Sequence, residues 1–120
     1  MKIYIAHSKN SDYKEELYVP LQNSSLAKQH ELILPHQESS SLFSSKEFFQ
    51  SGCDLIIAEV SYPATGLGIE LGWANVYNTK IICVHKPGVK VARSLQAVSD
   101  TFLEYENSKD LIDKLEVVIL

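Results

Sequence analysis

Short apolar runs alternate with longer, more polar segments along the chain, and this alternation predicts its secondary structure. The apolar runs predict strands at Lys2–Ala6, Glu31–Leu34, Cys53–Val60, Lys80–His85 and Thr101–Tyr105. The segments between them predict helices at Asp12–Gln29, Lys46–Gln50, Gly68–Tyr77, Val91–Val98 and Ser108–Val117. Pro20 lacks a backbone donor inside the first helical segment, so we expect a break or a kink there, a break giving two short helices.

Strands and helices alternate without any hairpin signal, which predicts an α/β fold with a parallel sheet and helices on both faces. Five strands suit a flavodoxin-like or Rossmann-like order, in which the first and third strands flank the point where the strand order reverses. The loop after residue 6 and the turn after residue 60 should then border one crevice. At 120 residues, the chain is expected to form a single domain, residues 1–120.

Residues 54–72, DLIIAEVSYPATGLGIELG, combine a strand, a glycine-containing turn and a helix start. Such junctions border the binding crevices of open α/β sheets, which makes Glu70 a candidate for chemistry. The alternative is an acid that only stabilises the helix dipole, worth less than about 1 kcal/mol. Gly66 and Gly68 favour a site, since closely spaced glycines suggest positive φ or a close backbone approach. Position 71 is leucine, so the dinucleotide fingerprint is incomplete.

Other acids and the histidines carry weaker signals. Glu59 ends the central predicted strand and is either a ligand for a sugar hydroxyl or an acid leaving the sheet into solvent, with the second interpretation favoured. Asp54 begins that strand and is expected to be structural. The four histidines lack metal-ligand spacing, so no metal site is expected. Among them, His7 follows the first strand and should point into the crevice.

Composition limits the partners. The net charge is −4 and there is no block of Lys or Arg. The sequence therefore lacks the basic patch expected of a protein that binds a nucleic-acid polymer or an anionic membrane. The first apolar run is too short for a signal peptide, and no segment approaches membrane-spanning length. Cys53 and Cys83 lie among apolar neighbours and are interpreted as buried thiols of a cytoplasmic protein. A small anionic ligand remains compatible with this charge.

The pattern of residues 54–72 resembles the nucleoside 2-deoxyribosyltransferase superfamily and is especially similar to its 2′-deoxynucleoside 5′-phosphate N-hydrolase branch. The similarity extends from Lys2 to the C-terminal helix. It implies a flavodoxin-like domain that forms homodimers or higher homo-oligomers. It also implies cleavage of the N-glycosidic bond of a (deoxy)nucleoside or nucleoside 5′-monophosphate, without a metal or organic cofactor.

The resemblance assigns roles to residues by position. Glu70 matches the catalytic nucleophile, and Tyr4 matches a tyrosine that orients it. A carboxylate suits this chemistry because it can stabilise or trap the oxocarbenium-like sugar. Ser94 falls where a neighbouring subunit contributes a serine to the 5′-phosphate. The remaining candidate substrate-binding residues are His7, Ser8, Lys9, Thr65, Gly66 and Gly68.

The sequence departs from the family pattern at the partner groups. The family's aspartate, which protonates the departing base, corresponds to Lys46. Glu47 is adjacent and is the main candidate to replace it, with Glu38 and His7 as alternatives. Ala64 stands where a serine or aspartate is expected. These departures keep a second hypothesis open, a non-catalytic nucleotide-binding module, and a third, a purely structural role.

A dimer interface has one candidate pair of residues. Trp73 and Tyr77 lie one turn apart on a predicted helix and are suited either to an interface or to packing against the sheet.

Overall fold

The sheet has the predicted order. The structure is a computed structural model that describes residues 1–37 and 45–119. Its strands are β1 (Lys2–His7), β2 (Glu31–Ile33), β3 (Leu55–Glu59), β4 (Lys80–His85) and β5 (Thr101–Glu104). All neighbouring strands are parallel, in the order β2-β1-β3-β4-β5. This confirms the flavodoxin-like prediction and places the ends of β1 and β3 side by side.

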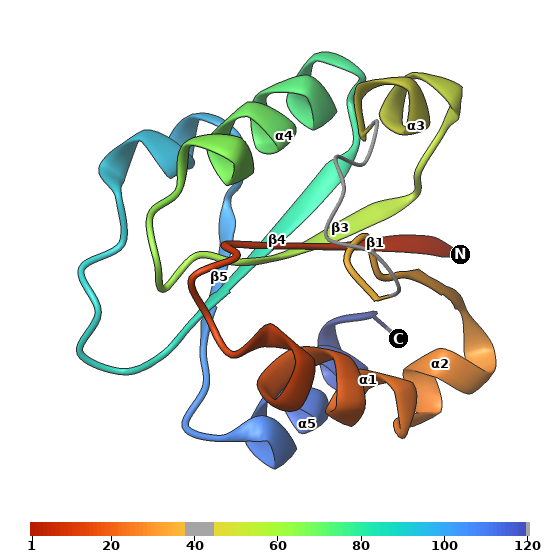
Figure 1. Cartoon of the computed structure of the whole chain (residues 1–120), viewed down its shortest axis with the longest axis vertical. Helices are drawn as coiled ribbons and strands as arrows, with labels where there is room; N and C mark the ends of the chain where they lie inside the picture. Colours follow the sequence, from red (N-terminus) through yellow and green to blue (C-terminus); the bar gives the residue numbers. More distant parts are fainter. Residues whose placement is uncertain (38–44, 120) are drawn as a thin grey trace.

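Helices cover both faces of the sheet (Figure 1). The helical elements are the π-helix η1 (Lys14–Tyr18), α1 (Val19–Gln22), α2 (Ser25–Gln29), α3 (Ser45–Ser51), α4 (Thr65–Val76), the 3-10 helix η2 (Arg93–Ala97) and α5 (Ser108–Ile119). One face carries α3 and α4, and the other carries α1, α2 and α5 (Figure 1). Within the described residues, none of these helices has the length and apolar character needed to cross a membrane.

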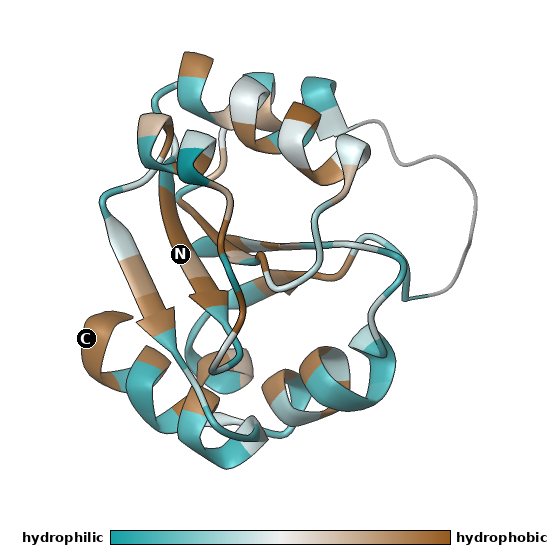
Figure 2. Ribbon diagram, turned by 90° about the vertical axis from the view of Figure 1, so that its left-hand side faces the viewer, coloured by the Kyte–Doolittle hydropathy of each residue, from teal (hydrophilic) through white to brown (hydrophobic). Residues whose placement is uncertain are grey.

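The central strands are buried on both faces, which explains their continuous apolar sequence. In β1, Ile3 and Ile5 join the core beneath α1 and α5. Tyr4, between them, points to the opposite face and joins the core beneath α3 and α4. Figure 2 shows these hydrophobic strands between helices whose outward surfaces are largely hydrophilic.

The first helical segment breaks later than predicted. Pro20 lies in the first turn of α1, which directly follows the π-helix η1. The helical run ends instead at Asn23, and Ser24 is extended before α2 begins. The expectation of short helices is therefore confirmed. A full break lies at Ser24 and not at Pro20, where the helix changes instead from π to α.

Helix α4 begins three residues earlier than predicted, at Thr65. Gly66 and Gly68 consequently lie in its first turn, and the expectation of positive φ at these glycines is wrong. The positive-φ glycines of the described chain are Gly52 and Gly88. Glu70 lies in the second turn of α4, beyond the reach of the favourable N-terminal dipole. The helix-dipole explanation of this acid therefore loses its basis.

Glu59 is buried, contrary to the favoured interpretation of an acid leaving the sheet. Its side chain is only 3% exposed. The carboxylate accepts hydrogen bonds from the backbone N–H of Ser61 and from the hydroxyl of Tyr105. Ser61 in turn accepts a hydrogen bond from the backbone N–H of Lys86 (2.8 Å). Glu59 therefore ties the turn after β3 to the ends of β4 and β5.

Removing the Tyr105 hydroxyl should weaken the fold measurably. In a Tyr105→Phe variant, a buried carboxylate loses one of its two donors, so we expect the free energy of unfolding to fall by about 1–3 kcal/mol. Urea denaturation measures this change. Tyr62→Phe is the matched control: it deletes only a bond to the half-exposed Lys86 (3.1 Å) and should cost less than about 1 kcal/mol. Equal losses in both variants would contradict the structural role of Glu59.

Candidate functional site

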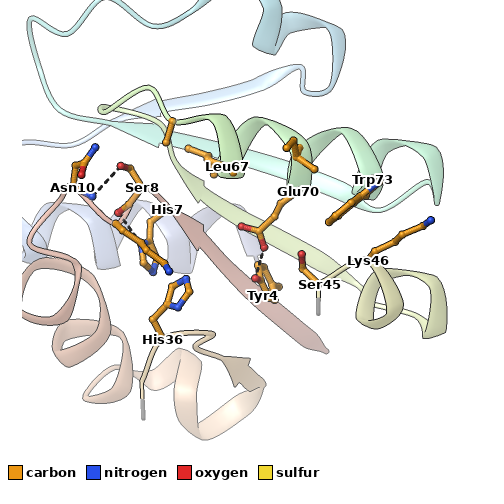
Figure 3. Close-up of a pocket in the computed structure, with 14 residues that line it drawn as sticks. Tyr4, His7, Ser8, Asn10, His36, Ser45, Lys46, Leu67, Glu70 and Trp73 are labelled. Carbon is orange, nitrogen blue, oxygen red and sulfur yellow. Dashed lines mark hydrogen bonds between the residues drawn. The ribbon is translucent and has the colours of Figure 1, made fainter. Parts of the chain in front are cut away.

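A pocket of about 550 Å³ opens at the carboxyl end of β1 and extends between α3 and α4. Six predicted site residues line it: Tyr4, His7, Ser8, Lys9, Gly66 and Glu70. The loop after β1 and the start of α4 therefore share one crevice, as the predicted strand order required. Figure 3 shows Glu70 in the middle of the pocket, with Ser8 and Asn10 toward one end and Lys46 toward the other.

Tyr4 holds the Glu70 carboxylate from the floor of the pocket. The Tyr4 hydroxyl donates a hydrogen bond to Oε2 of Glu70 (Figure 3). The Tyr4 ring is 1% exposed and packs edge-on against Phe49, with ring centroids 4.9 Å apart. Because burial and the neighbouring Glu70 charge both raise the pKa of Tyr4, its hydroxyl stays protonated and remains a donor.

The Glu70 carboxyl has a pKa above its ordinary value, because burial penalises its charged form. Hydrogen bonds from the side chains of Tyr4 and Ser45, together with the charge of Lys9, act in the opposite direction and lower the pKa. Ser45 is itself buried at the start of α3. The result is a partly buried acid with a fixed orientation, the arrangement expected of a reactive carboxylate.

Both ring nitrogens of His7 are occupied. Nδ1 lies 3.0 Å from the backbone oxygen of Ser8, and Nε2 lies 2.7 Å from the Tyr18 hydroxyl. The Tyr18 oxygen accepts the backbone N–H of His36 (3.1 Å), which leaves its own proton for Nε2. His7 is therefore a neutral imidazole with its proton on Nδ1. Its nitrogens have no free proton for a departing base.

The same bonds shape the loop after β1. Ser8 is buried, and its hydroxyl accepts the backbone N–H of Asn10 (3.0 Å). Its carbonyl accepts the Ser11 hydroxyl (2.9 Å) as well as the His7 ring N–H. The loop is thus folded back on itself, with Lys9 and Asn10 exposed at the pocket. A cation and polar groups presented in this way suit an anion.

His7 should make the fold sensitive to mild acid. Burial lowers the pKa of His7 from 6.5 to about 4, so the unfolded chain binds this proton more readily than the folded chain. Stability from this group is complete above pH 6.5 and declines as the pH falls toward 4. At pH 4.5 we expect a loss of about 2–3 kcal/mol relative to pH 7, measured by urea unfolding. A His7→Gln variant should lose that part of the pH dependence; an unchanged difference between the two pH values would contradict the assignment.

The structure does not bring the other candidate residues into the pocket. Glu47 is exposed on α3 and does not line it, whereas its neighbour Lys46 does. Thr65 and Gly68 are exposed in the first turn of α4, outside the lining. Ser94 is exposed on η2, also away from this pocket. Glu38, the further candidate donor, lies outside the described residues.

Several lining residues were not predicted as site residues: Asn10, His36, Ser45, Lys46, Ala64, Leu67, Ile69 and Trp73. His36 had a usable signal, because it follows β2, and the strand order sets the end of β2 beside the end of β1. Trp73 lies three residues after Glu70 on α4 and therefore shares its helix face. Trp73 and Tyr77 both pack partly buried against the core beneath α3 and α4. Ser45 had no signal of its own.

The described part of the chain contains no group of His, Cys, Asp or Glu side chains suited to a metal ion. Cys53 is half-buried just before β3, Cys83 is buried in β4, and both are free thiols. Asp54, just before β3, accepts a hydrogen bond from the backbone N–H of Lys2 (2.7 Å). This exposed contact lies at the amino ends of β1 and β3 and is structural.

Comparison with known proteins finds relatives that are named for reactions of nucleotides. No protein-family model matches the chain. A 66-residue stretch, 55% of the chain, is 35% identical to a Methanosarcina mazei protein named "Putative 2′-deoxynucleoside 5′-phosphate N-hydrolase 1". A 34-residue stretch, 28% of the chain, is 44% identical to the Homo sapiens 5-hydroxymethyl-dUMP N-hydrolase. These matches span only 41% and 20% of the two relatives.

The fold comparison covers nearly the whole chain. The solved structure of the Clostridium botulinum CMP N-glycosidase BcmB superimposes with a TM-score of 0.66 at 26% sequence identity. The superposition includes 97% of this chain and 99% of that one. Two local sequence matches and a full-length structural match thus agree with the flavodoxin-like strand order. The chain is therefore similar in sequence and fold to proteins that cleave nucleotides, and these similarities support the nucleoside 2-deoxyribosyltransferase-like superfamily.

Proposed function

We propose that the protein is an enzyme that cleaves the N-glycosidic bond of a nucleoside 5′-monophosphate, with Glu70 as the nucleophile. The observation that carries this proposal is the hydrogen bond from the buried Tyr4 hydroxyl to the Glu70 carboxylate inside the pocket. All three matched proteins are named for the cleavage of nucleotides, which supports the same reaction class here.

The chemistry follows from the placement of Glu70. As the bond between C1′ and the base nitrogen breaks, the sugar gains oxocarbenium character, and a nearby carboxylate can stabilise or trap it. The Tyr4 hydroxyl holds the carboxylate in one orientation, so little reorganisation is needed at the moment of reaction. Water then hydrolyses the glycosyl ester and restores Glu70; transfer to a second base would follow the same path.

The 5′-phosphate is proposed to bind at the loop after β1. Ser8 and its bonds to Asn10 and Ser11 preform this loop, and Lys9 supplies a positive charge at its exposed side. Lysine is a point charge without the bidentate fork of arginine, so the loop recognises the anion more by charge than by geometry. The exposed Ser94 is proposed to complete the phosphate site of a neighbouring copy in a homodimer or larger homo-oligomer. A monomer under assay conditions, measured by sedimentation, would contradict this part.

A cytoplasmic location is also proposed. Two free thiols, Cys53 and Cys83, support it, because disulfide bonds are rare in a reducing compartment.

A second candidate function is a non-catalytic nucleotide-binding module. It is favoured by one observation: Glu70 is the sole carboxyl group among the described residues that line the pocket, so a separate carboxylic acid for the departing base is missing there.

One experiment separates the two. The protein is incubated with a panel of ribo- and deoxyribonucleosides and their 5′-monophosphates, and free base is measured chromatographically while binding is measured by calorimetry. Release of free base from at least one 5′-monophosphate is expected. Binding without release across the panel would favour the non-catalytic module, and neither binding nor release would contradict both.

A further inference from the structure

The end of the pocket opposite the phosphate loop has its own chemistry. Figure 3 shows Trp73 and Lys46 there, on the far side of Glu70 from Ser8 and Asn10. Trp73 shares the pocket-facing side of α4 with Glu70, and its half-buried ring packs against the core beneath α3 and α4. This packing leaves a firmly seated aromatic surface at the pocket. Such a surface suits a planar, apolar-faced ring.

Charge is unevenly distributed along the pocket. Glu70 stands near the middle, with lysines contributed by two different elements: Lys9 by the loop after β1 and Lys46 by α3. The Lys46 side chain is exposed on a flexible four-carbon stem, at the same end of the pocket as Trp73 (Figure 3). An ammonium group donates hydrogen bonds and accepts none, so at this end the pocket recognises an acceptor or a developing negative charge.

We propose that Trp73 and Lys46 form the base subsite, in which Trp73 stacks on a pyrimidine ring and Lys46 binds a carbonyl oxygen of that ring. Lys46 then stabilises the negative charge that collects on the base as it departs. This inference rests on the proposed N-glycosidase function. It makes Lys46 a catalytic residue that acts by charge and needs no carboxylic acid.

The electron flow is balanced without a proton from the enzyme. The C1′–N1 bond breaks and its electron pair remains with the base, where it is shared with the ring carbonyl oxygens. A Glu70 oxygen forms a bond to C1′. A water molecule protonates the base anion, and the hydroxide that remains hydrolyses the ester to give the sugar phosphate and the Glu70 carboxylate, so one water is consumed overall.

The same arrangement selects against purines. A purine carries no carbonyl oxygen beside N9, and it leaves most readily after an acid protonates its ring. The described lining offers no carboxyl group besides Glu70 for that task. We therefore expect kcat/KM for pyrimidine 5′-monophosphates to exceed that for purine 5′-monophosphates by about 10-fold or more.

A Lys46→Met variant tests the role of the charge at nearly constant side-chain length. The substrates are uridine 5′-monophosphate and its 5-fluoro derivative, as ribo- or deoxyribonucleotides according to which the unmodified protein cleaves. We expect kcat for the uridine nucleotide to fall by about 10- to 100-fold, the usual effect of losing a charged hydrogen bond. The loss for the 5-fluoro substrate should be clearly smaller, because fluorine already stabilises the base anion.

Lys28→Met is the matched control, since Lys28 is an exposed lysine on α2, on the opposite face of the sheet; its kinetics should match the unmodified protein. Circular dichroism and the melting temperature verify that both variants fold. Equal losses on the two substrates, or no loss, would overturn the role of Lys46 while leaving the N-glycosidase function intact. A preference for purines would overturn the base subsite. Failure of the unmodified protein to release any base would overturn both proposals together.

Discussion

Replacing Glu70 with glutamine should lower kcat for base release on the order of 10⁴-fold or more, the scale seen when a nucleophile is removed from an enzyme. Glutamine matches the shape of glutamate and can still accept the Tyr4 hydroxyl, so the pocket keeps its form. Its neutral amide neither stabilises a positive sugar nor forms the glycosyl ester. Single-turnover release of free base measures the loss directly.

The effect should be confined to chemistry. Nucleotide binding to Glu70→Gln, measured by calorimetry, should stay within a few-fold of the unmodified protein, because the phosphate loop is unaltered. Glu15→Gln, at an exposed position of η1, serves as the control and should leave turnover unchanged. Turnover retained by Glu70→Gln would remove this residue from the mechanism.

Removing the Tyr4 hydroxyl should have the second-largest effect. A Tyr4→Phe variant keeps the ring contact with Phe49 but loses a hydrogen bond to a charged group. Such bonds contribute about 1.5–3 kcal/mol, which corresponds to a loss of about 10- to 100-fold in kcat.

The pH profile gives this prediction a second readout. Glu70 must be ionised to react, so activity disappears as the pH falls through its pKa, which burial already raises. The Tyr4 bond lowers that pKa, and its removal should shift the acidic limb of the kcat profile to higher pH. Tyr77→Phe removes a hydroxyl at the end of α4 and should leave the limb in place. A Tyr4→Phe profile identical to that of the unmodified protein would contradict the orienting role.

The sheet was predictable because burial on both faces leaves a local signature. Strand β4 matches its predicted bounds, Lys80–His85, since four consecutive residues are buried there. Alternation of strand and helix then left few possible topologies. The start of α4 was missed for a local reason: Gly66 and Gly68 are poor helix formers, yet packing of the helix against the sheet overrides that preference.

The site was only partly predictable, because its contacts join distant parts of the chain. Tyr4 and Glu70 were paired through the family resemblance, and no local pattern indicates a bond across 66 positions. The buried position of Glu59 depends on its hydrogen bond with Tyr105, which follows β5. In the sheet, β4 lies between β5 and the strand that carries Glu59. The neutral state of His7 depends on its burial in the folded protein, where Tyr18 contacts its Nε2 atom. Such partners follow from the folded arrangement, not from the sequence near each residue.

In the proposed reaction, Glu70 attacks C1′ of a nucleotide. The most direct test is incubation with a 2′-fluoro-arabino nucleotide, whose fluorine slows hydrolysis of a glycosyl ester, followed by intact-mass measurement and peptide mapping. We expect a sugar-phosphate adduct on the peptide containing Glu70, formed with one equivalent of free base and absent from Glu70→Gln. Release of base without any adduct, or an adduct on another residue, would contradict it.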